Sequence, residues 1–225
     1  MKNANKASSQ NHGQRQDTKI LVFLKAPLLG LPKSRLAKDI GDSQTLSAYR
    51  TLVSDFLLSL QQRTTVELVF TPVNSRAEIA PWIHHPWEAN PQAEGDLGQR
   101  LSAAFETAFT KGFKKVLALG VDCPYVTPSD LSEAETALDS HPVVIGPAND
   151  GGYWLIGLQK PQPQLFEDIP WSTASVFPVT QKKATLCNLS YHILRTLEDV
   201  DDLESWNRYL DWKSHNQSPL TDRSF

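Results

Sequence analysis

Short β-branched or apolar runs alternate with longer stretches of helical period from Lys19 onward. Six runs have the length and composition of strands, and they cover residues 19–24, 66–70, 115–120, 142–146, 153–158 and 190–196. Strands that alternate with helices are typical of a mostly parallel sheet flanked by helices. The pattern therefore predicts an α/β protein.

Apolar residues at helical spacing predict helices over Ser43 to Leu60 and over Leu97 to Phe109. A third helix is expected to begin at Pro128, with Thr127 as its N-cap, and a closing helix carries Leu203, Trp206 and Leu210. The region 161–180 is rich in Pro and aromatic residues. We expect it to be an irregular excursion that lies over the active site.

A chain of 225 residues is long enough for one substantial α/β domain. We expect this domain to cover residues 19–212. The polar, basic segment 1–18 is predicted to be a disordered tail, and 213–225 a C-terminal tail.

The composition limits the kinds of partner. A net charge of −3 gives no overall attraction to nucleic acid, and no apolar run approaches the roughly 20 residues that span a bilayer. Cys123 and Cys187 stand alone without a CxxC partner, which favours a reducing cytoplasm over a disulfide framework. His84 and His85 lack a partnered nucleophile, and we interpret them as surface residues. The oligomeric state is not indicated.

A cationic loop follows the first predicted strand and ends in Lys33-Ser-Arg35. Lys25, Lys33 and Arg35 offer donors for phosphate oxygens, and Gly30 permits close approach of the backbone. The spacing differs from a Walker A loop, because Pro32 precedes Lys33 where that loop needs Gly. The alternative is a solvated basic loop.

Carboxylates follow two further strands. Asp122 comes directly after 115–120, where it would suit Mg²⁺ or Mn²⁺, although a turn Asp that caps local N–H groups is the alternative. Asp199 and Asp201 precede the closing helix and could add metal ligands. An acidic cap at a helix N-terminus would explain the same run.

Two glycine-containing segments complete the candidate site. Asp150-Gly151-Gly152-Tyr153 lets the main chain pass close to a ligand, with a ring and a hydroxyl from Tyr153, or it forms a plain β-turn. The segment 95–100 opens a helix and presents free N–H groups together with Arg100. Its alternative is a simple N-cap by Asp96.

The order of these clusters resembles the nucleotide-diphospho-sugar transferase superfamily of GT-A fold. The likeness covers roughly 19–210 and is carried by KAPLLGLPKSRLA, GDLGQR, GVDCP, GPANDGGYWLIGL and EDVDD. Within the superfamily, the chain is similar to the bacterial glycosyltransferase-like branch related to 2-phospholactate guanylyltransferase and the molybdenum-cofactor guanylyltransferases. Proteins of that branch are associated with radical SAM proteins and with arsenosugar biosynthesis.

The resemblance implies a three-layer Rossmann-like fold and a role for each cluster. The first loop would wrap the phosphates of a nucleotide, the segment 95–100 would lie by the base and ribose, and 150–153 would line the sugar or acceptor side. Asp122 stands at the metal-binding aspartate of the family, while the terminal acidic segment departs from the usual pattern. The nucleotide-binding set that follows from the resemblance is Lys25, Ala26, Pro27, Gly30, Lys33, Arg35, Gly95, Asp96, Leu97, Gly98 and Arg100.

Two metal-dependent transferase chemistries fit this site, with Asp122, Lys33 and Arg35 as the catalytic groups. The first is glycosyl transfer from a nucleotide-diphospho-sugar to a small-molecule acceptor, which the family branch favours. The second is nucleotidyl transfer from an NTP to a phosphorylated acceptor, with release of pyrophosphate. A non-catalytic nucleotide-binding protein is the third hypothesis.

Overall fold

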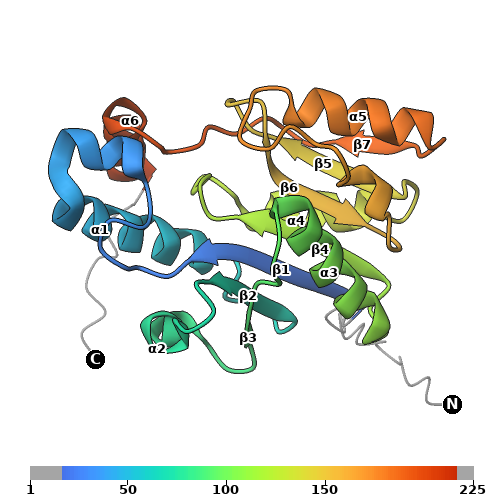
Figure 1. Ribbon diagram of the computed structural model, residues 1–225, viewed down its shortest axis with the longest axis horizontal. Coiled ribbons are helices and arrows are strands. Elements are labelled where there is room, and N and C mark those ends of the chain that lie inside the picture. Colours follow the sequence, from blue (N-terminus) through green and yellow to red (C-terminus); the bar gives the residue numbers. More distant parts are fainter. Residues whose placement is uncertain (1–16, 217–225) are drawn as a thin grey trace, which may run out of the picture.

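Seven strands form one sheet in the computed structural model, which describes residues 17–216 (Figure 1). Their order across the sheet is β3-β2-β1-β4-β6-β5-β7. The strand bounds are Thr18–Lys25 (β1), Val66–Thr71 (β2), Glu88–Pro91 (β3), Lys115–Gly120 (β4), Val143–Pro147 (β5), Tyr153–Leu158 (β6) and Tyr191–Ile193 (β7). All pairs are parallel except those of β6, which runs antiparallel to β4 and β5. The prediction of a mostly parallel sheet is confirmed.

Within residues 17–216, five helices and two short 3₁₀ turns connect the strands, and a sixth helix follows the last strand. The helices are Ser34–Leu58 (α1), Arg76–Ile79 (α2), Leu97–Thr110 (α3), Pro128–Ala137 (α4), Val176–Leu186 (α5) and Leu203–Asn216 (α6), and the turns are Ala80–Trp82 (η1) and Pro163–Leu165 (η2). No helix within residues 17–216 combines the length and apolar character needed to cross a bilayer.

The sheet is covered on both faces, as predicted. On one face, α1 and α4 bury side chains such as Phe56 and Leu131 against alternate residues of β1 and β4. On the other face, α3 and α5 contribute Phe105 and Ala184 to a second cluster. Because β1 lies between two covered faces, its residues from Thr18 to Val22 are all buried, which explains its continuous apolar sequence.

The last helix is fastened to the first. Tyr209 of α6 is fully buried, and its hydroxyl and the Lys213 ammonium both bind the Asp55 carboxylate of α1. Leu52 and Val200 pack with Tyr209 in a separate apolar cluster. This docking fixes the acidic segment that precedes α6 beside the beginning of α1.

Several bounds differ from the predictions. Helix α1 begins at Ser34 rather than Ser43, because the chain stays helical on both sides of a single non-helical residue, Gly41. Strand β1 begins at Thr18, α6 continues to Asn216 beyond residue 212, and β7 covers only 191–193 of the expected 190–196. Strand β3 and helix α5 were not predicted. The rest of the predicted tails, 1–16 and 217–225, lies outside the described residues.

A partly buried ion-pair network lies at the end of the sheet opposite the candidate site. Lys19 donates to Glu88 at 2.8 Å and pairs with Glu67 at 3.1 Å, while Lys111 donates to Glu88 at 3.1 Å. Hydrogen bonding from Lys19, assisted by Lys111, outweighs burial and lowers the pKa of Glu88 from 4.5 to about 2. Glu88 is therefore ionised in the folded protein well below the pH at which it is protonated in the unfolded chain.

Replacing Glu88 with Gln should lower stability at neutral pH by at most about 1 kcal/mol, because half of this side chain is exposed. A depressed folded pKa contributes stability above the unfolded pKa and loses it as pH falls. The wild type should therefore lose this contribution between pH 4.5 and about 2, and E88Q should not. Urea unfolding across that range is the measurement. The exposed carboxylate Glu106 provides the control E106Q, and identical pH profiles for E88Q and wild type would contradict the assignment.

Candidate nucleotide and metal site

A cavity of about 880 Å³ opens at the carboxyl ends of β1 and β4. This volume lies within the range of small-molecule sites. Every polar cluster singled out in the sequence reaches it, through Lys25, Lys33, Arg35, Leu97, Arg100, Asp122, Asp150, Gly152, Tyr153, Asp199 and Asp201. The convergence follows from topology, since the ends of parallel strands meet at one edge of a sheet.

Seven residues of the predicted site do not line this cavity. They are Ala26, Pro27, Gly30, Gly95, Asp96, Gly98 and Gly151. Ala26 and Pro27 are buried beneath the first loop, and Gly30 is exposed at its turn. Their predicted roles in binding a nucleotide or a substrate stay predictions.

The loop after β1 is pinned by a tyrosine that the sequence pattern marked only as a core residue. The buried hydroxyl of Tyr49 donates to the Lys25 carbonyl at 2.8 Å and accepts from the Lys25 N–H at 3.1 Å. Both backbone groups of Lys25 are thereby satisfied at the point where the strand ends. The Lys25 side chain is left exposed at the cavity wall.

Lys33 lies beside Asp122 and Asp201 in the cavity wall, and its side chain is buried there rather than exposed to solvent. Its side chain is 3% exposed, and its ammonium donates to the Asp122 carboxylate and, at 2.8 Å, to Asp201. Burial alone would lower the pKa of Lys33, but attraction to the two carboxylates outweighs it and raises the pKa. The sequence predicted Lys33 as a phosphate clamp, which stays a prediction, and the structure shows its ammonium bonded to two of the three candidate metal ligands.

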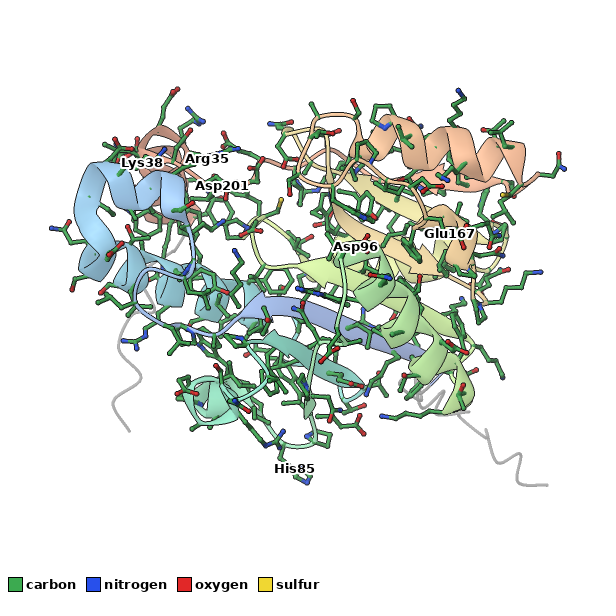
Figure 2. All side chains as sticks on the ribbon, in the orientation of Figure 1. Arg35, Lys38, His85, Asp96, Glu167 and Asp201 are labelled. Carbon is green, nitrogen blue, oxygen red and sulfur yellow. The ribbon has the colours of Figure 1, made fainter. Side chains whose placement is uncertain are left out.

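Arg35 lies at the rim of the same site. Its side chain is 72% exposed, and its guanidinium lies 4.0 Å from the second oxygen of Asp201. Figure 2 shows Arg35 and Asp201 beside each other at the start of α1. Arg35 is therefore the cation most accessible to an incoming anion at this end.

The segment before α6 places two carboxylates in different electrostatic settings. Burial, followed by repulsion from Asp150 and Asp201, raises the pKa of Asp199 to about 6. Asp201 is also partly buried, which alone would raise its pKa, yet its contact with Lys33 lowers it. The Val200 N–H donates to the Asp122 carbonyl at 2.9 Å, which ties this segment to the end of β4.

Three of the alternatives left open by the sequence are decided by local hydrogen bonds. Asp96 and Gln99 form a reciprocal capping box at the start of α3, so Asp96 acts as the N-cap. Asp202 accepts from the Ser205 N–H at 2.9 Å and caps α6, while its neighbour Asp201 faces Lys33. Asp122 directs its carboxylate to Lys33, which differs from a turn cap.

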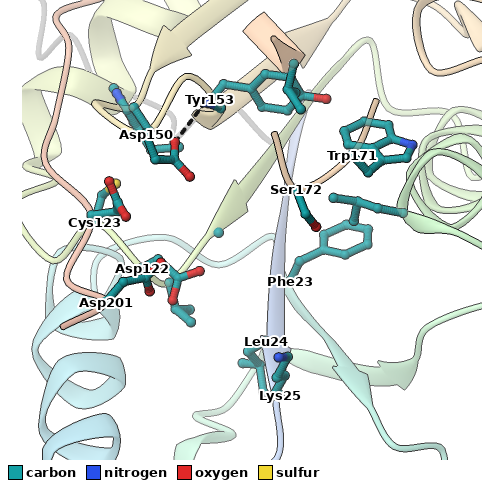
Figure 3. Close-up of a pocket in the computed structure, with 18 of the residues that line it drawn as sticks. Phe23, Leu24, Lys25, Asp122, Cys123, Asp150, Tyr153, Trp171, Ser172 and Asp201 are labelled. Carbon is teal, nitrogen blue, oxygen red and sulfur yellow. Dashed lines mark hydrogen bonds between the residues drawn. The ribbon is translucent and has the colours of Figure 1, made fainter. Parts of the chain in front are cut away.

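The Asp150 turn both connects β5 to β6 and lines the cavity. Asp150 accepts from the Gly152 N–H at 2.8 Å, drawn as a dashed line in Figure 3. The Tyr153 hydroxyl, which was expected to face a ligand, is buried beside Thr180. Figure 3 shows its ring directed away from Asp122 and Asp201, so Tyr153 offers the cavity a ring surface and no hydroxyl.

The region 161–180 forms one wall of the cavity. Residues 171–174 line it, and Trp171 packs edge-on against Tyr153. Gly151 has φ +87, and a Cβ there would collide with the backbone of Ala174, so a glycine is required for this wall to approach the turn. The position of the wall matches the expectation for 161–180, although the region also contains η2 and the beginning of α5.

Several lining residues were missed by sequence reasoning. Gln92 donates to the Leu24 and Val69 carbonyls and accepts from Arg100 at 3.2 Å, which orients that guanidinium at the cavity wall. Phe23, although it belongs to the central strand β1, is partly exposed because the cavity reaches its face of the sheet. Its place in an apolar run gave no signal of this exposure.

The remaining titratable candidates, Cys123, His84 and His85, differ in where they lie. Cys123 lines the cavity but is 2% exposed, and burial followed by the charge of Asp122 raises its pKa well above the usual range. Its thiol therefore stays protonated and is a poor nucleophile. His84 and His85 are exposed away from the cavity, as predicted.

The carboxylates of the cavity suit a hard cation whose other ligands are water and substrate oxygens. No group of three His, Cys, Asp or Glu side chains within residues 17–216 is arranged to hold a metal ion, so Asp122, Asp199 and Asp201 do not form a ready cage. Asp122 and Asp201 nevertheless converge on one positive charge, the Lys33 ammonium. Two carboxylates completed by water and substrate phosphates are the usual protein site for Mg²⁺.

Comparison with known proteins agrees with this architecture. The model of the family described as "Uncharacterized protein conserved in bacteria (DUF2064)" matches residues 57–173, which is about half of the chain. The chain belongs to this family. A comparison with curated proteins finds no match for it.

Solved structures of similar proteins extend the likeness from residues 57–173 to most of the chain. A protein from Desulfovibrio desulfuricans G20, assigned by its name to the nucleotide-diphospho-sugar transferases, is 29% identical with a TM-score of 0.83 over 89% of each chain. A cytidylyltransferase from Leptospira borgpetersenii is 16% identical, with a TM-score of 0.58 over 90% of this chain and 88% of that one. A manganese complex of a protein from Mycobacterium tuberculosis H37Rv is 12% identical, with a TM-score of 0.50 over 87% and 98%. This DUF2064 chain has the fold of the nucleotide-diphospho-sugar transferase superfamily, as predicted.

A glycine in the cavity floor keeps space open for a ligand. Gly120 pairs with Phe23 across β4 and β1, and a Cβ built on Gly120 meets no atom within 4 Å. A glycine weakens a strand unless another group must approach closely, and the space beside Gly120 belongs to the cavity.

Replacing Gly120 with Val should leave the fold intact and narrow the cavity, because the position is open and a β-branched residue suits a strand. We expect a melting temperature equal to or above that of the wild type and binding weaker by roughly tenfold, or about 1.4 kcal/mol. Calorimetric titration with a panel of nucleoside triphosphates and nucleotide-diphospho-sugars measures this, with G120A as an intermediate step. Equal affinities of G120V and wild type for every ligand bound would show that this space is unused.

Proposed function

We propose that the chain is a metal-dependent transferase that takes a nucleotide-activated donor and transfers its activated group to a small-molecule acceptor. The observation that carries the proposal is the contact of Lys33 with Asp122 and Asp201 in the wall of a cavity that Lys25 and Arg35 also line. Cationic groups suit the phosphates of a donor, and the carboxylates suit Mg²⁺ or Mn²⁺. A DUF2064 chain with the fold of nucleotide-using enzymes is consistent with this division.

Glycosyl transfer is the function we favour, because the Desulfovibrio relative that shares 29% of its residues is named for nucleotide-diphospho-sugars. In this reaction, the bond between the anomeric carbon and the diphosphate breaks as an acceptor oxygen bonds to that carbon. The departing nucleoside diphosphate carries growing negative charge, which Lys25 and Arg35 are positioned to stabilise. A bound divalent cation would neutralise part of the same charge.

The proposed donor and acceptor occupy different parts of the cavity. The donor phosphates would meet the cationic loop, and the nucleoside would extend toward Arg100 and Leu97 at the start of α3. The acceptor would enter between the Asp150 turn and the wall formed by residues 171–174. Trp171 and Phe23 give this part of the cavity two aromatic surfaces, which suit the apolar faces of a ring.

Nucleotidyl transfer is the second candidate, supported by the structural likeness to a cytidylyltransferase. In that reaction, a phosphate oxygen of the acceptor attacks the α-phosphorus of an NTP, and the bond to the β-phosphate oxygen breaks to release pyrophosphate. The same cations and carboxylates would serve both reactions. The two functions are therefore distinguished by their products.

Incubation with Mn²⁺ or Mg²⁺, candidate acceptors and either nucleotide-diphospho-sugars or NTPs should release a nucleoside diphosphate. Chromatography of nucleotides together with a coupled pyrophosphate assay detects both products in one reaction. Release of pyrophosphate alone would refute glycosyl transfer in favour of nucleotidyl transfer. Tight donor binding with neither product, over a broad panel of acceptors, would favour a non-catalytic nucleotide-binding protein.

Replacing Asp122 with Asn should abolish turnover and weaken metal-dependent donor binding at least about tenfold, because the neutral amide is a poor ligand for a hard cation. Calorimetric titration of the donor with and without Mn²⁺ separates the metal-dependent part. Asp202→Asn provides the control, since Asp202 belongs to the same acidic cluster but caps α6. Metal-dependent binding by D122N equal to that of the wild type would disprove the role of Asp122 as a metal ligand.

A further inference from the structure

Lys33 is the most constrained charged residue of the candidate site. Its ammonium is almost completely shielded from solvent and bonds to two carboxylates that come from distant parts of the chain. Asp122 follows β4, whereas Asp201 lies in the segment that leads into α6. The ammonium thus occupies the point where these two carboxylates converge, which is the point where a divalent cation shared by them would lie.

The backbone of Lys33 indicates that this contact determines its conformation. Lys33 has φ 54 and ψ 49, in the left-handed region that residues with a side chain rarely adopt because it strains the backbone. It also precedes the first turn of α1 without providing a side-chain cap, and a helix N-terminus disfavours a nearby positive charge. The bonds to Asp122 and Asp201 offset both penalties.

We propose that Lys33 is the resident counter-cation of the metal site, holding Asp122 and Asp201 together until a divalent cation displaces its ammonium. The displaced ammonium then becomes available to the phosphates of the donor. This inference rests on the proposed metal site, and it assigns Lys33 a second role beyond contact with phosphate.

This arrangement couples metal binding to donor binding. A divalent cation that binds alone must remove the ammonium from two carboxylates and leave it without a partner in a buried position. A donor phosphate supplies the replacement partner, so metal and donor strengthen each other's binding by the same factor. Arg35, at 4.0 Å from Asp201 and largely exposed, can attract the donor before Lys33 is released.

The test is calorimetric titration with Mn²⁺ alone, with no nucleotide present. Lys33→Met removes the competing charge, and we expect this variant to bind Mn²⁺ at least about tenfold more tightly than the wild type. Lys38→Met removes an exposed lysine from the same helix, visible in Figure 2, and should bind Mn²⁺ like the wild type. Damage to the fold would weaken Mn²⁺ binding, so a gain in affinity cannot arise from a purely structural role of Lys33.

Thermal unfolding provides a second readout. Without metal, K33M brings two carboxylates together with no cation between them, so its melting temperature should fall by several degrees and Mn²⁺ should raise it more than in the wild type. If K33M does not fold, Lys33→Gln offers a neutral amide that can donate to the carboxylates. This variant should also bind Mn²⁺ more tightly than the wild type.

Asp122→Asn in the same titration separates the two levels of inference. Loss of Mn²⁺ binding in D122N, with no gain in K33M or K33Q, would overturn the counter-cation role and leave the proposed metal site in place. Wild-type Mn²⁺ affinity in D122N would overturn the metal site itself, and the role of Lys33 with it. Loss of binding in D122N together with the gain in K33M supports both.

Discussion

The contact of the buried Lys33 ammonium with two carboxylates holds together the part of the cavity wall that carries these charges. Lys33, Asp122 and Asp201 come from the start of α1, the end of β4 and the approach to α6. Lys33 is the buried member of this contact, and a buried charge without a partner is strongly unfavourable, so the two carboxylates stabilise the ammonium in its place. The docking of α6 on α1 through Tyr209 brings the third segment to the first two.

The same contact contributes to opposite pKa shifts at two nearby carboxylates, Asp199 and Asp201. Asp201 touches Lys33, and its pKa falls despite burial, whereas Asp199 lacks that contact and its pKa rises to about 6. Their settings differ although the residues are only two positions apart, because at Asp199 burial and repulsion from Asp150 and Asp201 outweigh the attraction of Lys33.

The sequence predicted the parts of the fold that carry a strong apolar pattern. Strands β1, β2, β4 and β6 were predicted within two residues of their ends, because each is buried on both faces. Strand β3 escaped notice because only one of its four residues is buried at the edge of the sheet. Helix α5 has a Pro in its first turn and only three buried residues, so its sequence lacks an apolar stripe.

The candidate site was predictable as far as topology alone determines it. Polar residues at strand ends must converge at the carboxyl edge of a parallel sheet, and the predicted clusters all reach one cavity. The cation between Asp122 and Asp201 was not predictable, since Lys33 lies 89 and 168 positions away from them and only the packing of α6 brings them together. The wall of residues 171–174 depends in the same way on the backbone approach at Gly151.

Hydrogen bonds to nearby residues explain which acidic side chains cap helices and which face the cavity. Asp96 is followed three positions later by Gln99, and Asp202 by Ser205, and each of these pairs closes a helix cap. With α6 capped by Asp202, the adjacent Asp201 extends toward Lys33 and the cavity. The cap therefore does more than begin a helix, because it fixes the direction in which the neighbouring carboxylate projects. A run of acidic residues before a helix can therefore contain both a helix cap and a residue of the candidate site. Here Asp202 is the cap, and Asp201, which precedes it, is the site residue.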